Sequence, residues 1–288
     1  MDWLDTVIQG VLLGGLYALF AAGLSLIFGV MRLVNIAHGD LIGLASFLGL
    51  AVVQGIGMHP LLSLVLVIPI MLGLGYTLQR GLLNFTLGSD ILPPLLVTFG
   101  LSIIIQNVLL EIFSADTQRL QIGALSTASI HIGESLAVGW FPLIVFLCAI
   151  GVVAGLQVLL SATRLGRAFR ATSDDQQTAA LMGINDRHIF ALAMALALGV
   201  VALAGVFLAI RTNFSPAIGP ARLIYAFEAV IIGGLGNPWG TLVGGVILGV
   251  AQSVGATIHP GGQILAGHVA FLVVLVLRPG GLFPRTRE

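Results

Sequence analysis

The chain is made of long apolar stretches separated by short polar segments. A helix needs about 20 residues to cross roughly 30 Å of hydrocarbon, because each residue adds about 1.5 Å. Most of the apolar windows are that long, so the pattern predicts an all-α, polytopic transmembrane helical bundle of about nine spans, with eight or ten as alternatives. We expect residues 1–288 to form a single domain. The windows are 7–30, 40–56, 60–79, 93–114, 139–161, 189–210, 223–236, 239–258 and 262–278.

The window 223–236 is too short for a simple span. Apolar segments interrupted by Gly and Pro are tolerated at membrane depth only where protein or a water-filled cavity covers them. The pattern therefore predicts a broken or re-entrant helix here. The following stretch GGLGNPWGT (233–241) contains Asn237-Pro238, a turn signal, and predicts a tight hairpin or hinge at the cytoplasmic end.

Composition agrees with a membrane protein. The chain has 288 residues, of which 58% are hydrophobic and only 8% are charged, whereas soluble domains carry roughly 25% charged residues. A formal net charge of zero removes any electrostatic basis for binding nucleic acid. Several glycine pairs have the small-xxx-small spacing that lets helices pack closely. These pairs are Gly10/Gly14, Gly39/Gly43, Gly151/Gly155, Gly240/Gly244 and Gly245/Gly249.

All basic residues are arginine, and their positions set the orientation. Cytoplasmic loops are enriched in basic residues, and nine spans with an external N-terminus place most of them on that side. The predicted cytoplasmic set is Arg32, Arg80, Arg164, Arg167, Arg170, Arg187, Arg278, Arg285 and Arg287, and the external set is Arg119, Arg211 and Arg222. The polar loop 163–188 then faces the cytoplasm.

The longest external connection, 115–138, is either a surface for a periplasmic partner or an ordinary solvated loop.

The absence of lysine also limits the chemistry. A phosphate-binding loop of the form G-x-x-x-x-G-K-[ST] needs its lysine, so this chain is expected to have no ATPase site of its own. The histidines lack the spacing of metal ligands, and no acid–base cluster is present. We therefore expect neither an enzyme nor a metal site, with ATP and Mg²⁺ belonging to partner subunits.

The loop 163–188 contains signals for a short helix. Ser173 and Gln176 fit a capping box, with Ser173 as N-cap, and Asp174 and Asp175 would complement the positive end of the helix dipole. The helix formers Ala179, Ala180, Leu181 and Met182 follow, and Gly183 is a suitable stop. The loop is either a docking element with partly exposed Ala179–Met182, or an ordinary connection stabilised by its caps.

Some polar side chains interrupt the apolar windows, where they usually face a cavity or one another. Asn35 and His38, with Asp40 nearby, lie between the first two windows and either line a translocation pathway or form an interfacial turn. Gln106 and Asn107 either line the pathway or make interhelical hydrogen bonds.

Glu228 is a carboxylate inside the late apolar segments. It is a candidate proton-coupling group, a pathway residue, or a residue near the outer interface that pairs with Arg222. The interfacial or structural role is favoured, although the pair needs a bend because the two residues lie roughly 9 Å apart along an ideal helix.

Three stretches resemble ABC-transporter permeases for branched-chain amino acids (the Liv type). GRAFRATSDDQQTAALMGINDRHIFALAMALALGVVALAGV resembles the cytoplasmic loop and following span of that family. GLYALFAAGLSLIFGVMRLVNIAHGDLIGL resembles the first span and its N-x-A-H-G-[DE] motif, and AFEAVIIGGLGNPWGTLVGGVILGVAQS resembles the glycine-rich segment near the C-terminus. Together the three stretches cover about a third of the chain in collinear order.

The resemblance implies that the loop is the coupling segment seated in a groove of an ATPase subunit. The implied coupling residues are Arg167, Arg170, Ser173, Asp174, Asp175, Ala179, Ala180, Leu181, Gly183, Ile184 and Asn185. It further implies a permease subunit that moves branched-chain or other neutral amino acids across the bacterial inner membrane. Its implied partners are a second permease subunit (a homologous chain or a second copy), two ABC ATPase subunits, a periplasmic substrate-binding protein and membrane lipid.

Two alternative functions are compatible with the same sequence. Related permeases import urea or short amides, and others import sugars. From a different class, an ion-coupled secondary transporter or channel would work alone, with Glu228 as its titrating group.

Overall fold

The computed structural model describes residues 3–88, 92–132 and 136–283, so Arg285 and Arg287 lie outside the described residues. Each of the nine predicted windows coincides with a helix. Eight described segments are long and apolar enough to cross a membrane, and the last helix is a shorter apolar one of 16 residues. The all-α polytopic fold is confirmed. The helices are α1 (Trp3–Met31), α2 (His38–Ile56), α3 (Leu64–Gly81), α4 (Leu92–Phe113), α5 (Trp140–Ala162), α8 (Asp186–Arg211), α9 (Gly219–Gly233), α10 (Pro238–Ile258) and α11 (Gly262–Leu277).

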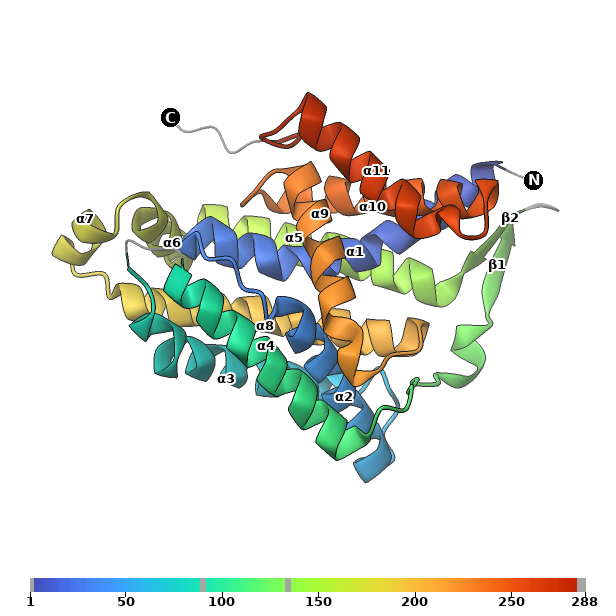
Figure 1. Ribbon diagram of the computed structural model, residues 1–288, viewed down its shortest axis with the longest axis horizontal. Coiled ribbons are helices and arrows are strands. Elements are labelled where there is room, and N and C mark those ends of the chain that lie inside the picture. The colour runs from blue at the N-terminus through green and yellow to red at the C-terminus, as the bar shows by residue number, and fades with distance from the viewer. Residues whose placement is uncertain (1–2, 89–91, 133–135, 284–288) are drawn as a thin grey trace.

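Helices α6 (Arg164–Asp174) and α7 (Gln176–Leu181) and the β-hairpin lie at opposite ends of the bundle (Figure 1). We call the end that carries α6 and α7 the α6–α7 end. The opposite end carries the antiparallel hairpin of β1 (Ser129–Ile132) and β2 (Leu136–Gly139), in which Ser129 lies opposite Gly139. The 3₁₀ turns are η1 (Leu83–Phe85), η2 (Gly123–Ser126) and η3 (Pro216–Ile218).

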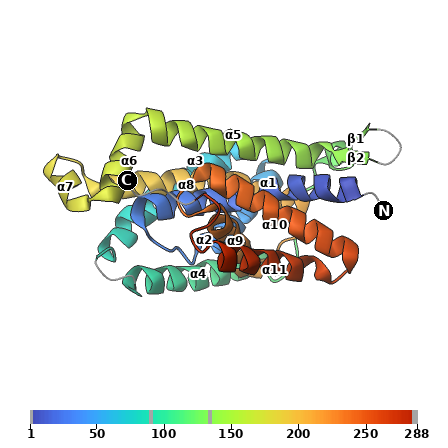
Figure 2. The same ribbon diagram turned by 90° about the horizontal axis from the view of Figure 1, so that it is seen from above.

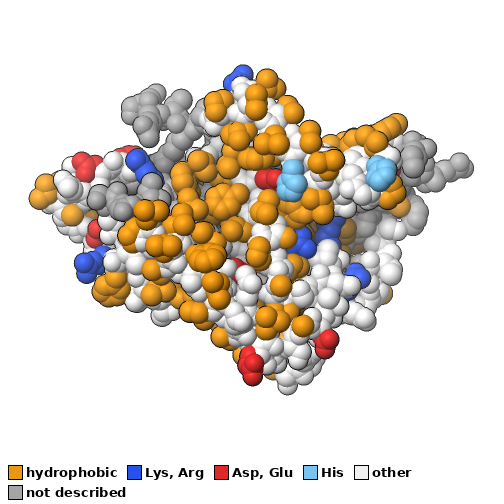
Figure 3. Space-filling model, viewed as in Figure 1, with side chains coloured by type: hydrophobic (Ala, Val, Ile, Leu, Met, Phe, Trp, Pro, Cys, Tyr) orange, Lys and Arg blue, Asp and Glu red, His pale blue; other side chains and the backbone are white. Residues whose placement is uncertain are grey.

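Helices α1 and α8 form the centre of the bundle, and most of their side chains are buried. Helices α3, α4 and α5 bury only one side, so their outer faces expose large apolar residues. Figure 2 shows α5 on one side of the central helices and α4 with α11 on the other. A broad hydrophobic surface covers the face seen in Figure 3. Such a surface is what a hydrocarbon environment requires.

Glycines bring the backbones of α1 and α10 into contact. A Cβ added at Gly249 would lie 2.3 Å from the Gly10 carbonyl oxygen, and one at Gly14 would lie 2.5 Å from the Val246 Cα. The predicted close packing is therefore confirmed for these glycines. A Cβ at Gly151 or Gly155 on α5 would meet nothing within 4 Å, so this pair makes no close helix contact in the described part of the chain.

Helix α9 lies at a steep angle to α1, α8 and α10 (Figure 1) and is seen nearly end-on in Figure 2. It begins after η3 at Gly219, where a Cβ would lie 1.9 Å from Oδ1 of Asp40. Helix α9 is continuous from Gly219 to Gly233 and with η3 forms one of the eight candidate spans, so a broken or re-entrant helix here stays a prediction. The predicted turn at Asn237 is confirmed, because its Oδ1 accepts a hydrogen bond from the Gly240 N–H at 3.1 Å and caps α10.

Candidate functional site

Helix α6 is fixed to the end of α5. Thr163 caps it, because its Oγ1 accepts a hydrogen bond from the Gly166 N–H at 3.0 Å. Gly166 packs directly on the α5 backbone, where a Cβ would lie 2.2 Å from the Leu159 carbonyl oxygen. Phe169 is fully buried, and the guanidinium of Arg170 donates to the Leu160 carbonyl. Arg167 reaches the Ala162 carbonyl at the same junction.

The predicted capping role of Ser173 is wrong. The chain stays helical through Asp174, so Ser173 lies in the last turn of α6, and Asp174 is at a helix C-terminus rather than at an N-terminus. The Ser173 hydroxyl donates to the Gly29 carbonyl at 2.8 Å, and Arg32 donates to the Ser173 carbonyl at 3.2 Å. Ser173 therefore ties α6 to the end of α1.

The N-cap of α7 is Asp175, whose backbone leaves the helical region (φ −151°, ψ 107°). Its Oδ1 accepts hydrogen bonds from the N–H groups of Gln177 at 2.9 Å and Thr178 at 3.1 Å, and its Oδ2 accepts one from the Thr178 hydroxyl at 2.7 Å. These bonds, first of all that from the Thr178 hydroxyl, lower the pKa of Asp175 because they favour its charged form. The predicted capping-box partner, Gln176, is the first helical residue instead.

Helix α7 ends as the sequence predicts, at Gly183 in the left-handed conformation (φ 83°). The Ile184 N–H donates to the Ala179 carbonyl at 3.1 Å and the Gly183 N–H donates to the Ala180 carbonyl at 3.0 Å. This is the pair of bonds of a Schellman motif. Asn185 then caps α8 by accepting a hydrogen bond from the His188 N–H at 3.2 Å.

The predicted exposure of Ala179–Met182 is correct at all but its first position. Ala179 faces the protein and is buried, whereas Ala180 is exposed. Leu181 and Met182 are 87% and 79% exposed, which is unusual for large apolar side chains at the tip of a capped helix. The hairpin of α6 and α7 thus projects an apolar tip from the α6–α7 end of the bundle.

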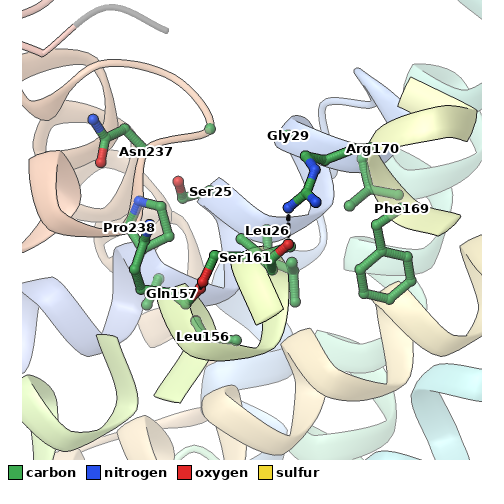
Figure 4. A pocket seen from close by; sticks show the side chains of 14 residues that line it. Ser25, Leu26, Gly29, Leu156, Gln157, Ser161, Phe169, Arg170, Asn237 and Pro238 are labelled. Atoms are coloured by element: carbon green, nitrogen blue, oxygen red, sulfur yellow. Dashed lines mark hydrogen bonds between the residues drawn. The ribbon is translucent and has the colours of Figure 1, made fainter. Parts of the chain in front are cut away.

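A cavity of about 230 Å³ lies beneath this hairpin, between α1, α5, α6 and the α9–α10 turn. Figure 4 shows Ser25, Gln157 and Asn237 on its walls and Arg170 at its edge, where the dashed line marks the bond to the Leu160 carbonyl. The Ser25 hydroxyl is buried without a hydrogen-bond partner among the described residues. The cavity therefore separates part of the hairpin from α1, α5 and the α9–α10 turn.

Asn35 and His38 are buried deep in the bundle. Helix α1 ends at Met31, and the following segment turns back so that α2 begins beside the middle of α1. His38 Nε2 donates to the Phe20 carbonyl at 2.8 Å, and both His38 and Asn35 are almost fully buried. Both side chains thus pack inside the bundle, and the choice between a translocation pathway and an interfacial turn stays a prediction.

Asp40 joins α2 to α4. Its carboxylate accepts hydrogen bonds from the Ser102 hydroxyl at 2.5 Å and from Gln106 Nε2 at 2.9 Å. Gln106 thus faces the bundle interior. Asn107 is exposed, and its amide donates to the Ile103 carbonyl of its own helix, so it does not join this cluster.

Glu228 pairs with His268 of α11, and the predicted pairing with Arg222 is wrong. The Arg222 guanidinium instead lies over the Tyr225 ring, 5.7 Å from its centroid. Sequence reasoning missed His268, although an ionisable group inside an apolar window calls for a polar partner. No spacing rule links residues 40 positions apart, so the partner itself was not predictable.

Comparisons with known sequences identify the family of this chain. Residues 6–277 match the family described as branched-chain amino acid transport system, permease component. The high-affinity branched-chain amino acid transport system permease protein BraD of Pseudomonas aeruginosa is 31% identical over 98% of this chain and 96% of BraD. LivH of Escherichia coli, a permease protein of the same kind of system, is 28% identical over 98% of this chain and 96% of LivH. PsaBC from Streptococcus pneumoniae, solved in complex with a Fab, aligns with a TM-score of 0.49 and 12% identity over 97% of this chain and 93% of that chain. With eight described segments long and apolar enough to cross a membrane and a family match over residues 6–277, the chain belongs to the branched-chain amino acid permease family of ABC transporters.

Proposed function

We propose that this chain is the membrane-spanning subunit of an ABC importer that carries branched-chain or other neutral amino acids across the bacterial inner membrane. Separate ATPase subunits would drive it, and a periplasmic binding protein would deliver the solute. The observation that carries the proposal is the projecting hairpin of α6 and α7 with its apolar tip. The names of the relatives support the solute class.

The tip of α7 has the properties of a docking element. Leu181 and Met182 offer apolar surface to a partner, and caps at both ends of α7 keep this surface in one conformation. A preorganised element loses little conformational entropy on binding. The α6–α7 end would then be cytoplasmic, in agreement with Arg164, Arg167 and Arg170 in α6.

The contacts of α6 suggest how a partner would move the permease. A force on α7 would reach Ser173 and, through the bonds to Gly29 and Arg32, the end of α1. The chain continues from there to His38 and Asp40, which lie at the start of α2. The ATPase subunits would thus bias two conformations of the membrane helices. ATP and Mg²⁺ would bind the ATPase subunits, and a second permease subunit would complete the transport unit.

Cysteine crosslinking tests the docking. Cys148 is the single cysteine, so Cys148→Ser gives a cysteine-free background for introducing one reactive thiol. Leu181→Cys should crosslink to the ATPase subunit in the purified transporter. Ile258→Cys is the matched control, because that residue is 72% exposed but lies at the opposite end of the bundle. Crosslinking from position 258 but not from 181 would reject the proposed docking surface.

The pairing of buried Glu228 with the partly exposed His268 favours one second candidate, an ion-coupled transporter that works alone. Proteoliposomes that contain the chain with the second permease subunit and the ATPase subunits, supplied with the binding protein, should take up leucine only with ATP on the ATPase side. The chain alone should show no uptake driven by a proton or sodium gradient. Glu228→Gln should abolish gradient-driven uptake under the second candidate, but should leave ATP-driven uptake largely intact under the proposal. Competition by excess urea distinguishes an amide importer, since urea should not inhibit leucine uptake.

A further inference from the structure

Two partly buried arginines have no acidic partner among the described residues. Arg211 is the last residue of α8, and Arg222 lies in the first half of α9. Nη1 of Arg211 and Nε of Arg222 are buried and have no hydrogen-bond partner among the described residues. Within residues 3–88, 92–132 and 136–283, the one ion pair is that of Glu228 and His268.

Arg222 lies against a pair of tyrosine rings. The rings of Tyr17 and Tyr225 lie 5.2 Å apart, and the Arg222 guanidinium lies over Tyr225. The charges of Arg211, Arg222 and Glu228 all act on the Tyr17 hydroxyl, which itself donates to Oε1 of Gln252 at 2.5 Å. Tyr17 is buried in the middle of α1, so these charges act well inside the bundle.

A guanidinium at membrane depth is costly unless an anion or a polar group compensates it. The planar group binds carboxylates through two parallel hydrogen bonds, a geometry that neutral amides cannot match. Glu228 acts on the same tyrosines but pairs with His268, so the two arginines form a candidate site for an anion from outside the described chain. Both side chains are only partly buried, so the site remains open to a ligand.

We propose that Arg211 and Arg222 bind the carboxylate of the transported solute during its passage through the permease. This inference rests on the proposed function and narrows it, because the solute must then carry a carboxylate. Neutral amino acids have one, whereas urea and short amides do not. The arginines would also disfavour solutes that carry only a positive charge, by direct repulsion.

Uptake by the assembled transporter gives the first test. Arg211→Gln and Arg222→Gln should each reduce ATP-driven leucine uptake by at least about tenfold, because each removes a charge-assisted hydrogen bond. Arg222→Lys keeps the charge but not the paired geometry, and should fall between Arg222→Gln and the wild type. Arg278→Gln is the matched control, since Arg278 is exposed at the end of α11, and it should transport like the wild type. Copurification with the ATPase subunits and unchanged basal ATP hydrolysis show that a variant is folded.

Ligand-dependent thermal stability of the purified transporter, without binding protein, gives the second test. L-leucine should raise the unfolding midpoint more than L-leucinamide, which differs in lacking the carboxylate. Arg222→Gln should remove that difference. Equal effects of the two compounds on the wild type, including no effect of either, would overturn the carboxylate site.

The two proposals fail in different ways. If the wild type shows no ATP-driven uptake of leucine or of any other neutral amino acid with its partner subunits, the proposed function itself is rejected, and the carboxylate site falls with it. If the wild type takes up leucine and the folded arginine variants do so equally well, only the carboxylate site is rejected.

Discussion

At the scale of single residues, Asp175 determines whether α7 is ordered. Replacing Asp175 with Ala removes the acceptor for the N–H groups of Gln177 and Thr178, so the first turn of α7 should fray. ATP-driven uptake should fall roughly fivefold, the size expected when a helix loses its cap, while Asp175→Asn should retain most activity because Asn also caps helices. Uptake by proteoliposomes, with ATP hydrolysis measured in parallel, checks this prediction. Equal uptake by the Ala variant and the wild type would show that the cap is dispensable.

The hydrogen bonds to the Asp175 carboxylate also determine how the stability of the α7 cap depends on pH. Because the hydrogen bonds lower the pKa of Asp175 in the folded state, its stabilising effect is fully present above the ordinary pKa of about 4 and is lost as the pH falls through the lowered value. The cap is therefore intact at physiological pH. Hydrogen exchange at the Thr178 amide should show no change in protection between about pH 6 and 8 that is attributable to Asp175.

The short helix after Ser173 was correctly predicted, but its N-cap is Asp175 and not Ser173. Ser173, Asp174 and Asp175 are all residue types that cap helices well, so local pattern could not rank them. The choice depends on Ser173, whose hydroxyl is used by the Gly29 carbonyl 144 residues away. A long-range contact of this kind leaves no trace in local spacing. The same reason explains why the pairing of Glu228 with His268 was missed.

At the scale of elements, the glycines of α1 and α10 give the sharpest stability prediction. Gly249→Leu would force a side chain against the Gly10 carbonyl, and should lower the free energy of unfolding by about 1–3 kcal/mol or more. Gly151→Leu is the matched control, because a Cβ at that position meets nothing within 4 Å. Thermal unfolding of the two variants in detergent compares them directly. A Gly249→Leu variant that unfolds at the wild-type temperature would contradict the close packing of α1 and α10.

Most elements were predictable, because apolar windows long enough to span a membrane permit few alternatives to helices. The separate helix α6 was missed, although Gly166, Phe169 and Thr172 recur at a spacing of three and are all buried. The steep direction of α9 could not be predicted, because it follows from the close approach of Gly219 to Asp40 of α2. Hydrophobic patterns give the lengths of helices but not their directions.

At the scale of the whole molecule, Ser173 links the hairpin to the transmembrane helices. Ser173→Ala removes the bond to the Gly29 carbonyl and should leave ATP hydrolysis by the partner subunits intact, while uptake per ATP falls severalfold. Ser161→Ala is a suitable control, since the Ser161 hydroxyl bonds only within α5 among the described contacts. The ratio of leucine taken up to ATP hydrolysed measures the effect. An unchanged ratio would mean that coupling follows another route.

This route requires that α1 and α10 move together. Their backbones meet at glycines along much of their length, and at the end away from the hairpin the hydroxyls of Thr6 and Thr257 lie 3.3 Å apart. Helices packed at backbone contact have little freedom to slide, since tightly packed interfaces do not deform continuously. The pair should therefore transmit a displacement of Ser173 across the whole bundle as one rigid body.

A disulfide between these two positions tests that rigidity. In the Cys148→Ser background, Thr6→Cys with Thr257→Cys should oxidise readily, because the two side chains already touch. ATP-driven uptake should be the same before and after oxidation, since the bond joins parts that do not separate during transport. Each single-cysteine variant, treated with the same oxidant, controls for chemical damage. Loss of uptake on oxidation and its return on reduction would show instead that α1 and α10 separate in each cycle, and the hairpin would then have to act on α1 alone.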